Sequence, residues 1–197
     1  EIMPSLVGSE MCIRDSDVFE SLPWVRRAVV RRAFPDGMEV ELQEHQAAAL
    51  WGEPDKSTLV NTHGEVFEAS LGDVEGENLL HLDGPNGSAA EVLRMSRVLK
   101  PVLEGGLKQP LQSLALSVHG GWHARMGSGA RIDIGRGTDE QLVARVQRFV
   151  DTFAQAGAKY GRTRSDFIET ADLRYADGYA LKLVGVTTGD GKKTGRK

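Results

Sequence analysis

Short apolar segments separated by turns of Gly, Pro, Asn and Asp follow one another along most of the chain, and this pattern limits the fold more than any other feature. Within the segments, apolar and polar residues alternate, which is the period of a strand with one buried face. Short strands at close spacing are typical of antiparallel sheets. In the segment 111–118, strict alternation places Leu111 and Leu114 on opposite faces. We expect strands at 24–34, 38–43, 47–51, 57–61, 65–68, 79–82, 111–118, 122–126, 130–134, 167–175 and 179–184, those from 47 to 82 forming an antiparallel meander.

The first predicted hairpin has the clearest turn. Its strand at 24–34 leads into the turn 35–37, where proline presets the first turn angle and glycine supplies a positive φ. On the return strand, Met38, Val40 and Leu42 alternate with acidic residues. We therefore expect this strand to be half-buried, with its apolar face covered.

Two longer stretches have the helical period. Ser88 precedes the first, and Glu91 three positions later completes the pattern of a capping box; we expect this helix to end at the glycine pair 105–106. The second covers 139–156 and carries a stripe of large apolar residues. The end of another helix is expected at 17–22. The fold class predicted is α+β: a helix end, a β-hairpin, and a mainly antiparallel β domain with two flanking helices.

Composition excludes several classes of protein. The chain has 197 residues, 40% of them hydrophobic, which is enough for a sizeable core. A single Cys rules out a disulfide framework and a zinc site built from cysteines. A net charge of −4 gives no sign of a nucleic-acid surface, and no apolar run approaches the roughly 18 residues that a membrane helix needs.

The two ends differ from the rest of the chain. Residues 1–16 have neither strand nor helix period, and 5–15 resembles translated sequencing adapter, so we expect 1–16 to be non-native. The alternative is a disordered N-terminal arm. The basic tail 186–197 is expected to be disordered.

Candidate catalytic and metal sites are weak. His119 and His123 have the spacing of a helical zinc pair, but on a strand this offset separates side chains by roughly 13 Å, too far for one ion. The carboxylates between 36 and 44 alternate with apolar residues, as on a solvated strand face. We expect no cofactor, no metal and no catalysis; the enzyme alternative predicts a bound metal or hydrolytic activity.

The last predicted hairpin, which folds about 176–178, is more informative. A strand at the end of a domain tends to lie at a sheet edge, and an edge can take an added strand from a partner. Tyr175 and Tyr179 are expected to be exposed aromatic side chains beside that edge. The alternative is an ordinary edge blunted by Arg174 and Lys182, and the pattern alone favours neither.

Five short motifs extend over most of 17–184. They are LPWV at 22–25, RRAFPDGMEV at 31–40, EHQAAALWG at 44–52, LVNTHGEVF at 59–67 and DLRYADG at 172–178. Each is short, but their combination and order are specific, and they resemble the bacterial cell-division family FtsQ.

The resemblance implies a protein anchored in the bacterial inner membrane by one helix, with a POTRA domain and a β domain in the periplasm. Residues 17–45 are then the C-terminal part of the POTRA domain and 46–185 the β domain. The first POTRA strand and helix, the membrane helix and the cytoplasmic tail are missing, so we expect the chain to be a fragment. Outside 1–16 the chain has no Cys, which suits an oxidising periplasm.

The resemblance also implies a non-catalytic scaffold of the division septum. Such a protein joins FtsB and FtsL and helps control septal peptidoglycan synthesis. In the family, FtsB adds a strand beside the last hairpin, and the matching positions are Arg174, Tyr175, Asp177 and Gly178, to which we add Tyr179. The alternative is a component of outer-membrane assembly or secretion, because POTRA domains also serve there.

Overall fold

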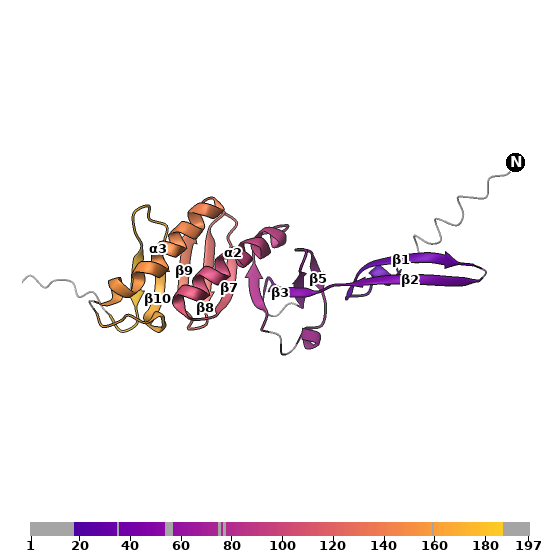
Figure 1. Cartoon of the computed structure of the whole chain (residues 1–197), viewed down its shortest axis with the longest axis horizontal. Coiled ribbons are helices and arrows are strands. Elements are labelled where there is room, and N and C mark those ends of the chain that lie inside the picture. Colours follow the sequence, from indigo (N-terminus) through magenta and orange to yellow (C-terminus); the bar gives the residue numbers. More distant parts are fainter. Residues whose placement is uncertain are drawn as a thin grey trace, which may run out of the picture. The chain divides into compact units, whose positions relative to one another are not determined.

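The structure, a computed structural model, describes residues 18–34, 36–53, 57–74, 76, 78–158 and 160–186. The predicted N-terminal segment 1–16 and the tail from 187 onward lie outside the described residues, as do the first residue of the 17–22 helix end and Pro35 of the hairpin turn. The chain divides into two compact units, Glu1–Leu79 (unit 1) and Leu80–Lys197 (unit 2). Figure 1 shows both units and labels many of their helices and strands.

Unit 1 begins with a short helical segment at 18–20 and the predicted hairpin. Strands β1 (Val25–Ala33) and β2 (Gly37–Glu44) pair antiparallel, and Val30 lies opposite Val40. The helical segment is fastened to the hairpin, because the backbone N–H of Ala28 donates to the Glu20 carboxylate at 3.0 Å. The predicted α+β start, a helix end followed by a hairpin, is confirmed.

The prediction that β2 is half-buried is wrong. Every residue of β2 is exposed, and Met38 keeps 65% of its surface in contact with solvent. Apolar residues that alternate along a strand are buried only where another layer covers their face. No part of the chain that the structure describes covers the apolar side of β2. On β1, by contrast, Val25, Ala28 and Val30 are buried.

The predicted meander is confirmed within unit 1. Strands β3 (Ala47–Trp51), β4 (Thr58–Asn61) and β5 (Val66–Glu68) pair antiparallel in chain order. A short 3₁₀ helix, η1 (Leu71–Val74), follows. The core of this part consists of Leu59, Phe67, Ala69 and Val74, with Trp24, Ala47, Leu50 and Leu79 packed against them.

The strands of unit 2 follow one another across the sheet in the order β11-β10-β9-β8-β7-β6. For β6 the meander prediction is wrong, because β6 does not lie next to β5 in the strand order. Instead β6 runs parallel to β7, and β9 likewise runs parallel to β10. A helix links each parallel pair, and such a crossover returns the chain to the same end of the sheet. The other pairs are antiparallel. The strands are β6 (Leu80–Asp83), β7 (Leu111–Leu116), β8 (Trp122–Met126), β9 (Arg131–Gly135), β10 (Ile168–Asp172) and β11 (Ala180–Leu183).

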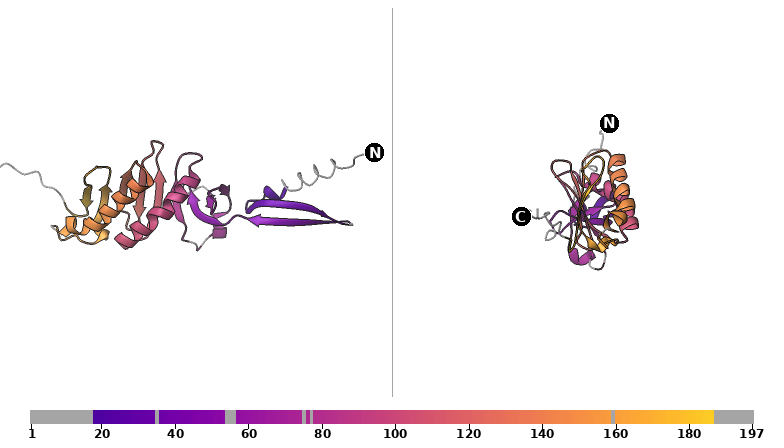
Figure 2. Two further views of the ribbon diagram at one scale, coloured as in Figure 1. Left: turned by 45° about the horizontal axis from the view of Figure 1, so that its top comes forward. Right: turned by 90° about the vertical axis from the view of Figure 1, so that its left-hand side faces the viewer.

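The two predicted helices are confirmed as α2 (Ala89–Leu107) and α3 (Asp139–Ala158). They lie on the same face of the sheet and pack on each other (Figure 2). Their apolar stripes form the core of unit 2, with Phe149 as its largest fully buried side chain. Within the described ranges, neither these nor any other helix is long and apolar enough to cross a membrane.

Both predicted ends of α2 are wrong in detail. Ser88 makes no side-chain cap; its hydroxyl donates to the Pro85 carbonyl at 2.6 Å, so the capping box with Glu91 does not form. At the other end, the helix continues through the glycine pair and stops at Leu107, where Lys108 takes the left-handed conformation with φ 55°. Gly106 has a packing role instead: a Cβ there would lie 1.8 Å from Cγ1 of Val150 on α3.

The alternation predicted for 111–118 is broken by an irregularity. The register of β7 against β8 shifts between Leu111 and Ser113, and as a result Leu111 and Leu114 are both buried. A β-bulge of this kind adds a residue and moves the following side chains to the other face.

Candidate functional site

The C-terminal edge of the unit 2 sheet is the site that the sequence predicted. Strand β11 is the last in the strand order and pairs with β10, Asp172 lying opposite Ala180. Among the described residues, no strand pairs along its other side. The backbone of β11 therefore has free hydrogen-bonding groups on that side, which is what strand addition requires.

The connection before β11 is longer than predicted. Strand β10 ends at Asp172, so the predicted strands 167–175 and 179–184 are too long and Tyr175 lies in the connection. The N–H of Leu173 still donates to the Asp133 carbonyl of β9 at 2.8 Å. The next N–H, that of Arg174, donates instead to the Asp172 carboxylate at 3.1 Å, a turn-forming contact that ends the strand.

Arg174 is held in place by the residue two positions before it. Its Nε and Nη2 donate to the two carboxylate oxygens of Asp172 at 2.8 and 2.6 Å, a bidentate pair. These hydrogen bonds lower the pKa of Asp172 and raise the pKa of Arg174. Gly135 makes room for the pair: at its φ of 86° a Cβ would lie 2.8 Å from Cγ of Arg174.

Tyr175 is exposed as predicted, with 56% of its surface open to solvent. It lines an open hollow with a volume of about 500 Å³, formed by residues 175–180. The loop is anchored beside it, because Nη1 of Arg148 on α3 donates to the Ala176 carbonyl at 2.9 Å. An aromatic side chain at a fixed position next to a free strand edge is a suitable contact for a partner.

The expectation of a second exposed aromatic is wrong for Tyr179. It is half-buried, and its ring meets Phe149 edge-on at 5.1 Å between centroids. Its hydroxyl shares a hydrogen bond of 3.0 Å with the Thr152 hydroxyl. The nearby Asp177 is exposed, and Gly178 has open space around its Cβ position without a positive φ, so no tight hairpin turn requires glycine there.

The two cations that were expected to blunt this edge are both paired within the protein. Arg174 binds Asp172, and Nζ of Lys182 pairs with the Glu169 carboxylate. Pairing lowers the net positive charge that an approaching strand meets at this edge.

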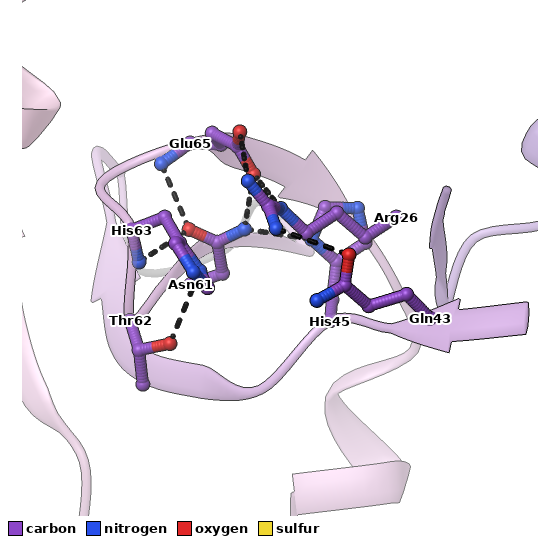
Figure 3. Close-up of polar contacts among 7 residues, drawn as sticks. All are labelled: Arg26, Gln43, His45, Asn61, Thr62, His63 and Glu65. Carbon is purple, nitrogen blue, oxygen red and sulfur yellow. Dashed lines mark hydrogen bonds and ion pairs between the residues drawn. The ribbon is translucent and has the colours of Figure 1, made fainter.

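A polar network that the sequence analysis missed lies in unit 1, around the β4–β5 turn (Figure 3). Its centre is Asn61, which is completely buried. Asn61 Oδ1 accepts the backbone N–H groups of His63 and Glu65, both at 2.9 Å. Its Nδ2 donates to Glu65 Oε2 at 2.6 Å and to His45 Nδ1 at 2.9 Å. The sequence signal for this site is an Asn at the end of a strand, directly before a short turn.

Arg26 connects the β1–β2 hairpin to this network. Its Nε and Nη2 donate to the Glu65 carboxylate at 2.6 and 3.0 Å, and its Nη1 donates to Gln43 Oε1 at 3.3 Å. The hydrogen bonds from Arg26, followed by the one from Asn61, lower the pKa of Glu65 from 4.5 to about 2. The same pairing raises the pKa of Arg26.

His45 completes the network as a neutral ring. It stacks on Phe67, with 4.2 Å between centroids and 3° between planes. Burial lowers the pKa of His45. Because Nδ1 accepts a hydrogen bond from Asn61, the single ring proton is assigned to Nε2.

The network predicts how Glu65→Gln changes stability with pH. A carboxyl whose folded pKa is lowered contributes stability above its unfolded pKa, and loses that contribution as pH falls through the folded value. We expect Glu65→Gln to be less stable than the parent chain at pH 7, and the difference to shrink between pH 4.5 and about 2. Urea unfolding at a series of pH values measures this; a difference that is constant across that window contradicts the assignment.

The candidate metal and catalytic groups lie on strand faces and in turns. The His123 ring pairs with the Asp133 carboxylate at 2.6 Å on the strand face, and His119 lies in the preceding turn. On β2, Glu41 is exposed and lies 3.7 Å from Arg31, as on a solvated strand. Among the residues that the structure describes, no three His, Cys, Asp or Glu side chains are grouped so that they could hold a metal ion.

Comparison with known proteins identifies the family. The family model "POTRA domain, FtsQ-type" matches residues 16–45, and the model "Cell division protein FtsQ/DivIB, C-terminal" matches residues 49–174, well over half of the chain. The chain belongs to the FtsQ family. FtsQ proteins are cell-division proteins, and the FtsQ-type match at 16–45 favours this family over outer-membrane assembly components.

Individual FtsQ relatives agree. The cell division protein FtsQ of Thiomonas arsenitoxydans is 40% identical over 202 residues, which cover 100% of this chain and 72% of the relative. FtsQ of Burkholderia pseudomallei is 34% identical over 89% of this chain and 68% of its own length. FtsQ of Shewanella oneidensis is 40% identical over 82% of this chain and 57% of its own length. The chain thus spans between 57% and 72% of these relatives. The first alignment includes residues 1–16, whose origin stays a prediction.

Proposed function

We propose that the chain is the periplasmic part of an FtsQ-type division scaffold that binds FtsB and FtsL by strand addition at the β11 edge. In this role it helps control septal peptidoglycan synthesis and carries out no catalysis itself. Membership of the FtsQ family supports a part in cell division. The partners, the mode of binding and the location at the septum are our proposal.

The observation that carries the proposal is the free side of β11 next to the hollow at Tyr175. An added strand gains main-chain hydrogen bonds along β11, and these supply affinity with little dependence on sequence. The hollow, lined by residues 175–180, accepts a side chain of the added strand and supplies specificity. An aromatic anchor at the centre of such a contact typically carries a large share of the binding energy.

The five predicted contact residues take different parts in this arrangement. Tyr175 is the anchor, and Arg174, held by Asp172, presents its remaining N–H groups to a carboxylate of the partner. Asp177, which is exposed, and Gly178 line the same hollow. Tyr179 acts indirectly, because its contact with α3 fixes the start of β11.

We further propose that the domains are those expected from the family: 17–45 as the C-terminal part of a POTRA domain, 46–185 as the β domain and 186–197 as a tail. The whole protein is then a single-pass protein of the bacterial inner membrane whose bulk lies in the periplasm. These assignments rest on the family and on the FtsQ-type POTRA match at 16–45.

The anchor role predicts the effect of Tyr175→Ala on binding. Loss of a hot-spot aromatic is expected to weaken binding of purified FtsB by about 2 kcal/mol, or about 30-fold in Kd. Isothermal titration with FtsB from Thiomonas arsenitoxydans measures this. Tyr160→Ala is the matched control, because Tyr160 is also an exposed tyrosine of unit 2. The proposal is wrong if Tyr175→Ala folds normally and binds with unchanged affinity, or if both variants lose affinity equally.

A further inference from the structure

The face of the unit 2 sheet that the helices do not cover carries charges in rows. Leu114, Ala124 and Ile132 lie opposite one another across three strands and are buried on the helix side. Because successive side chains point to opposite faces, the residues on either side of this row point to the open face. The strand registers therefore align two rows there.

We call these rows the basic row and the acidic row. They lie two residues apart along each strand, or roughly 7 Å. The basic row consists of Ser113, Arg125, Arg131 and Thr170, each opposite the next across β7, β8, β9 and β10. The acidic row consists of Ala115, His123, Asp133 and Asp172 on the same strands.

Both carboxylates of the acidic row have hydrogen-bonding partners within the protein. Asp133 pairs with His123 at 2.6 Å. Asp172 pairs with Arg174, also at 2.6 Å. The acidic side chains of this row are therefore already held by contacts within the protein.

The basic row is different. Arg125 and Arg131 lie directly opposite each other on β8 and β9, and both are exposed. Within the part of the chain that the structure describes, neither has an ion-pair partner. Like charges directly opposite on a sheet face are destabilising, so the fold gains nothing from this pair by itself.

We propose that the basic row binds an acidic segment of a partner protein, whose carboxylates lie over Arg125 and Arg131. Arginine is suited to this, because its planar guanidinium binds a carboxylate through two N–H groups. The hydroxyls of Ser113 and Thr170 flank the two arginines in this row and can donate to the same segment.

The acidic row selects the class of partner. A uniformly anionic surface, such as lipid headgroups, would place negative charge over Asp133 and Asp172 as well as over the arginines. A peptide can place carboxylates over one row and neutral or basic side chains over the other. The net charge of −4 on the chain also opposes non-specific attraction of polyanions. This surface is separate from the β11 edge, so it does not depend on the proposed function.

The test uses the full chain and a fluorescein-labelled ten-residue peptide in which Glu and Ser alternate. Fluorescence anisotropy at low ionic strength measures its Kd, because surface ion pairs are screened by salt. The double variant Arg125→Glu/Arg131→Glu is expected to weaken peptide binding by about tenfold, because two exposed ion pairs with the peptide are lost. The control Lys100→Glu/Arg136→Glu changes net charge equally at other exposed positions and is expected to stay within about twofold of the parent.

Three outcomes overturn the proposal. One is absence of saturable binding by the parent chain, and another is an equal loss of affinity in the two double variants. The third is a parent chain that does not bind the peptide but binds phosphatidylglycerol vesicles in a way that depends on both arginines.

A stability measurement separates a binding role from a structural one. Arg125→Glu replaces a like-charged cross-strand pair by an opposite-charged pair, so we expect the urea midpoint of unfolding to rise while peptide binding falls. A variant that loses both stability and binding shows that Arg125 supports the fold, and this result also overturns the proposal.

Discussion

Gly106→Ala is expected to lower the free energy of unfolding of the chain by about 3 kcal/mol, although it replaces glycine by the best helix former. A Cβ at this position would lie 1.8 Å from Cγ1 and 2.8 Å from Cβ of Val150. A valine in a helix is stiff about χ1, so Val150 cannot rotate away, and α2 and α3 have to separate instead. Urea unfolding, with the midpoint and the slope fitted separately, measures the loss.

The neighbouring glycine is the control. Gly105 lies on the exposed side of the same helix turn, and its Cβ position has no other atom within 4 Å. Gly105→Ala is therefore expected to stabilise the chain by about 0.5 to 1 kcal/mol. In the double variant Gly106→Ala/Val150→Ala, much of the loss should be recovered, because the two changes are coupled through one contact. If Gly106→Ala stabilises the chain as Gly105→Ala does, the close approach of α2 and α3 is wrong.

Asn61→Ala is expected to have a similar effect, about 3 kcal/mol of lost stability, because buried groups are left without partners. The change removes four hydrogen bonds at once: those from the backbone N–H groups of His63 and Glu65, and those to the Glu65 carboxylate and the His45 ring. It also releases Glu65 from one of the groups that lower its pKa. Denaturant unfolding at pH 7 measures the loss.

Asn61→Asp distinguishes hydrogen bonding from packing, since the two side chains have nearly the same shape. The aspartate keeps an acceptor for the two backbone N–H groups but places an oxygen 2.6 Å from Glu65 Oε2. We expect the variant to be strongly destabilised at neutral pH, and to recover partly in acid, where the introduced carboxyl is protonated and can donate. A stability equal to that of the parent at pH 7 would show that the Asn61 amide does not hold this turn.

The sequence was sufficient for the strands and helices, because their signals are local. Alternation located the strands, and the 3.6-residue period located α2 and α3. Strand partners are not local: nothing in the pattern of 79–82 distinguishes the observed parallel pairing of β6 with β7 from the predicted meander. The glycine pair in α2 resembled a helix end, because the reason for Gly106 lies on another helix.

The candidate site was predictable to a similar extent. The position of β11 at a sheet edge followed from its place at the end of a domain, and the exposure of Tyr175 agreed with it. The burial of Tyr179 could not be foreseen, because it depends on where Phe149 and Thr152 of α3 lie. The exposed apolar side of β2 was missed for the opposite reason, since a pattern that predicts a buried face does not guarantee that something covers it.

The central claim, strand addition at the C-terminal edge, is tested most directly by amide hydrogen exchange along β11. FtsB at saturating concentration is expected to slow exchange of those amides of Ala180–Leu183 that do not pair with β10, while amides in the middle of α2 exchange at unchanged rates. Strand addition is contradicted if FtsB binds and the exchange of β11 does not change, or if the protection appears only elsewhere in the chain.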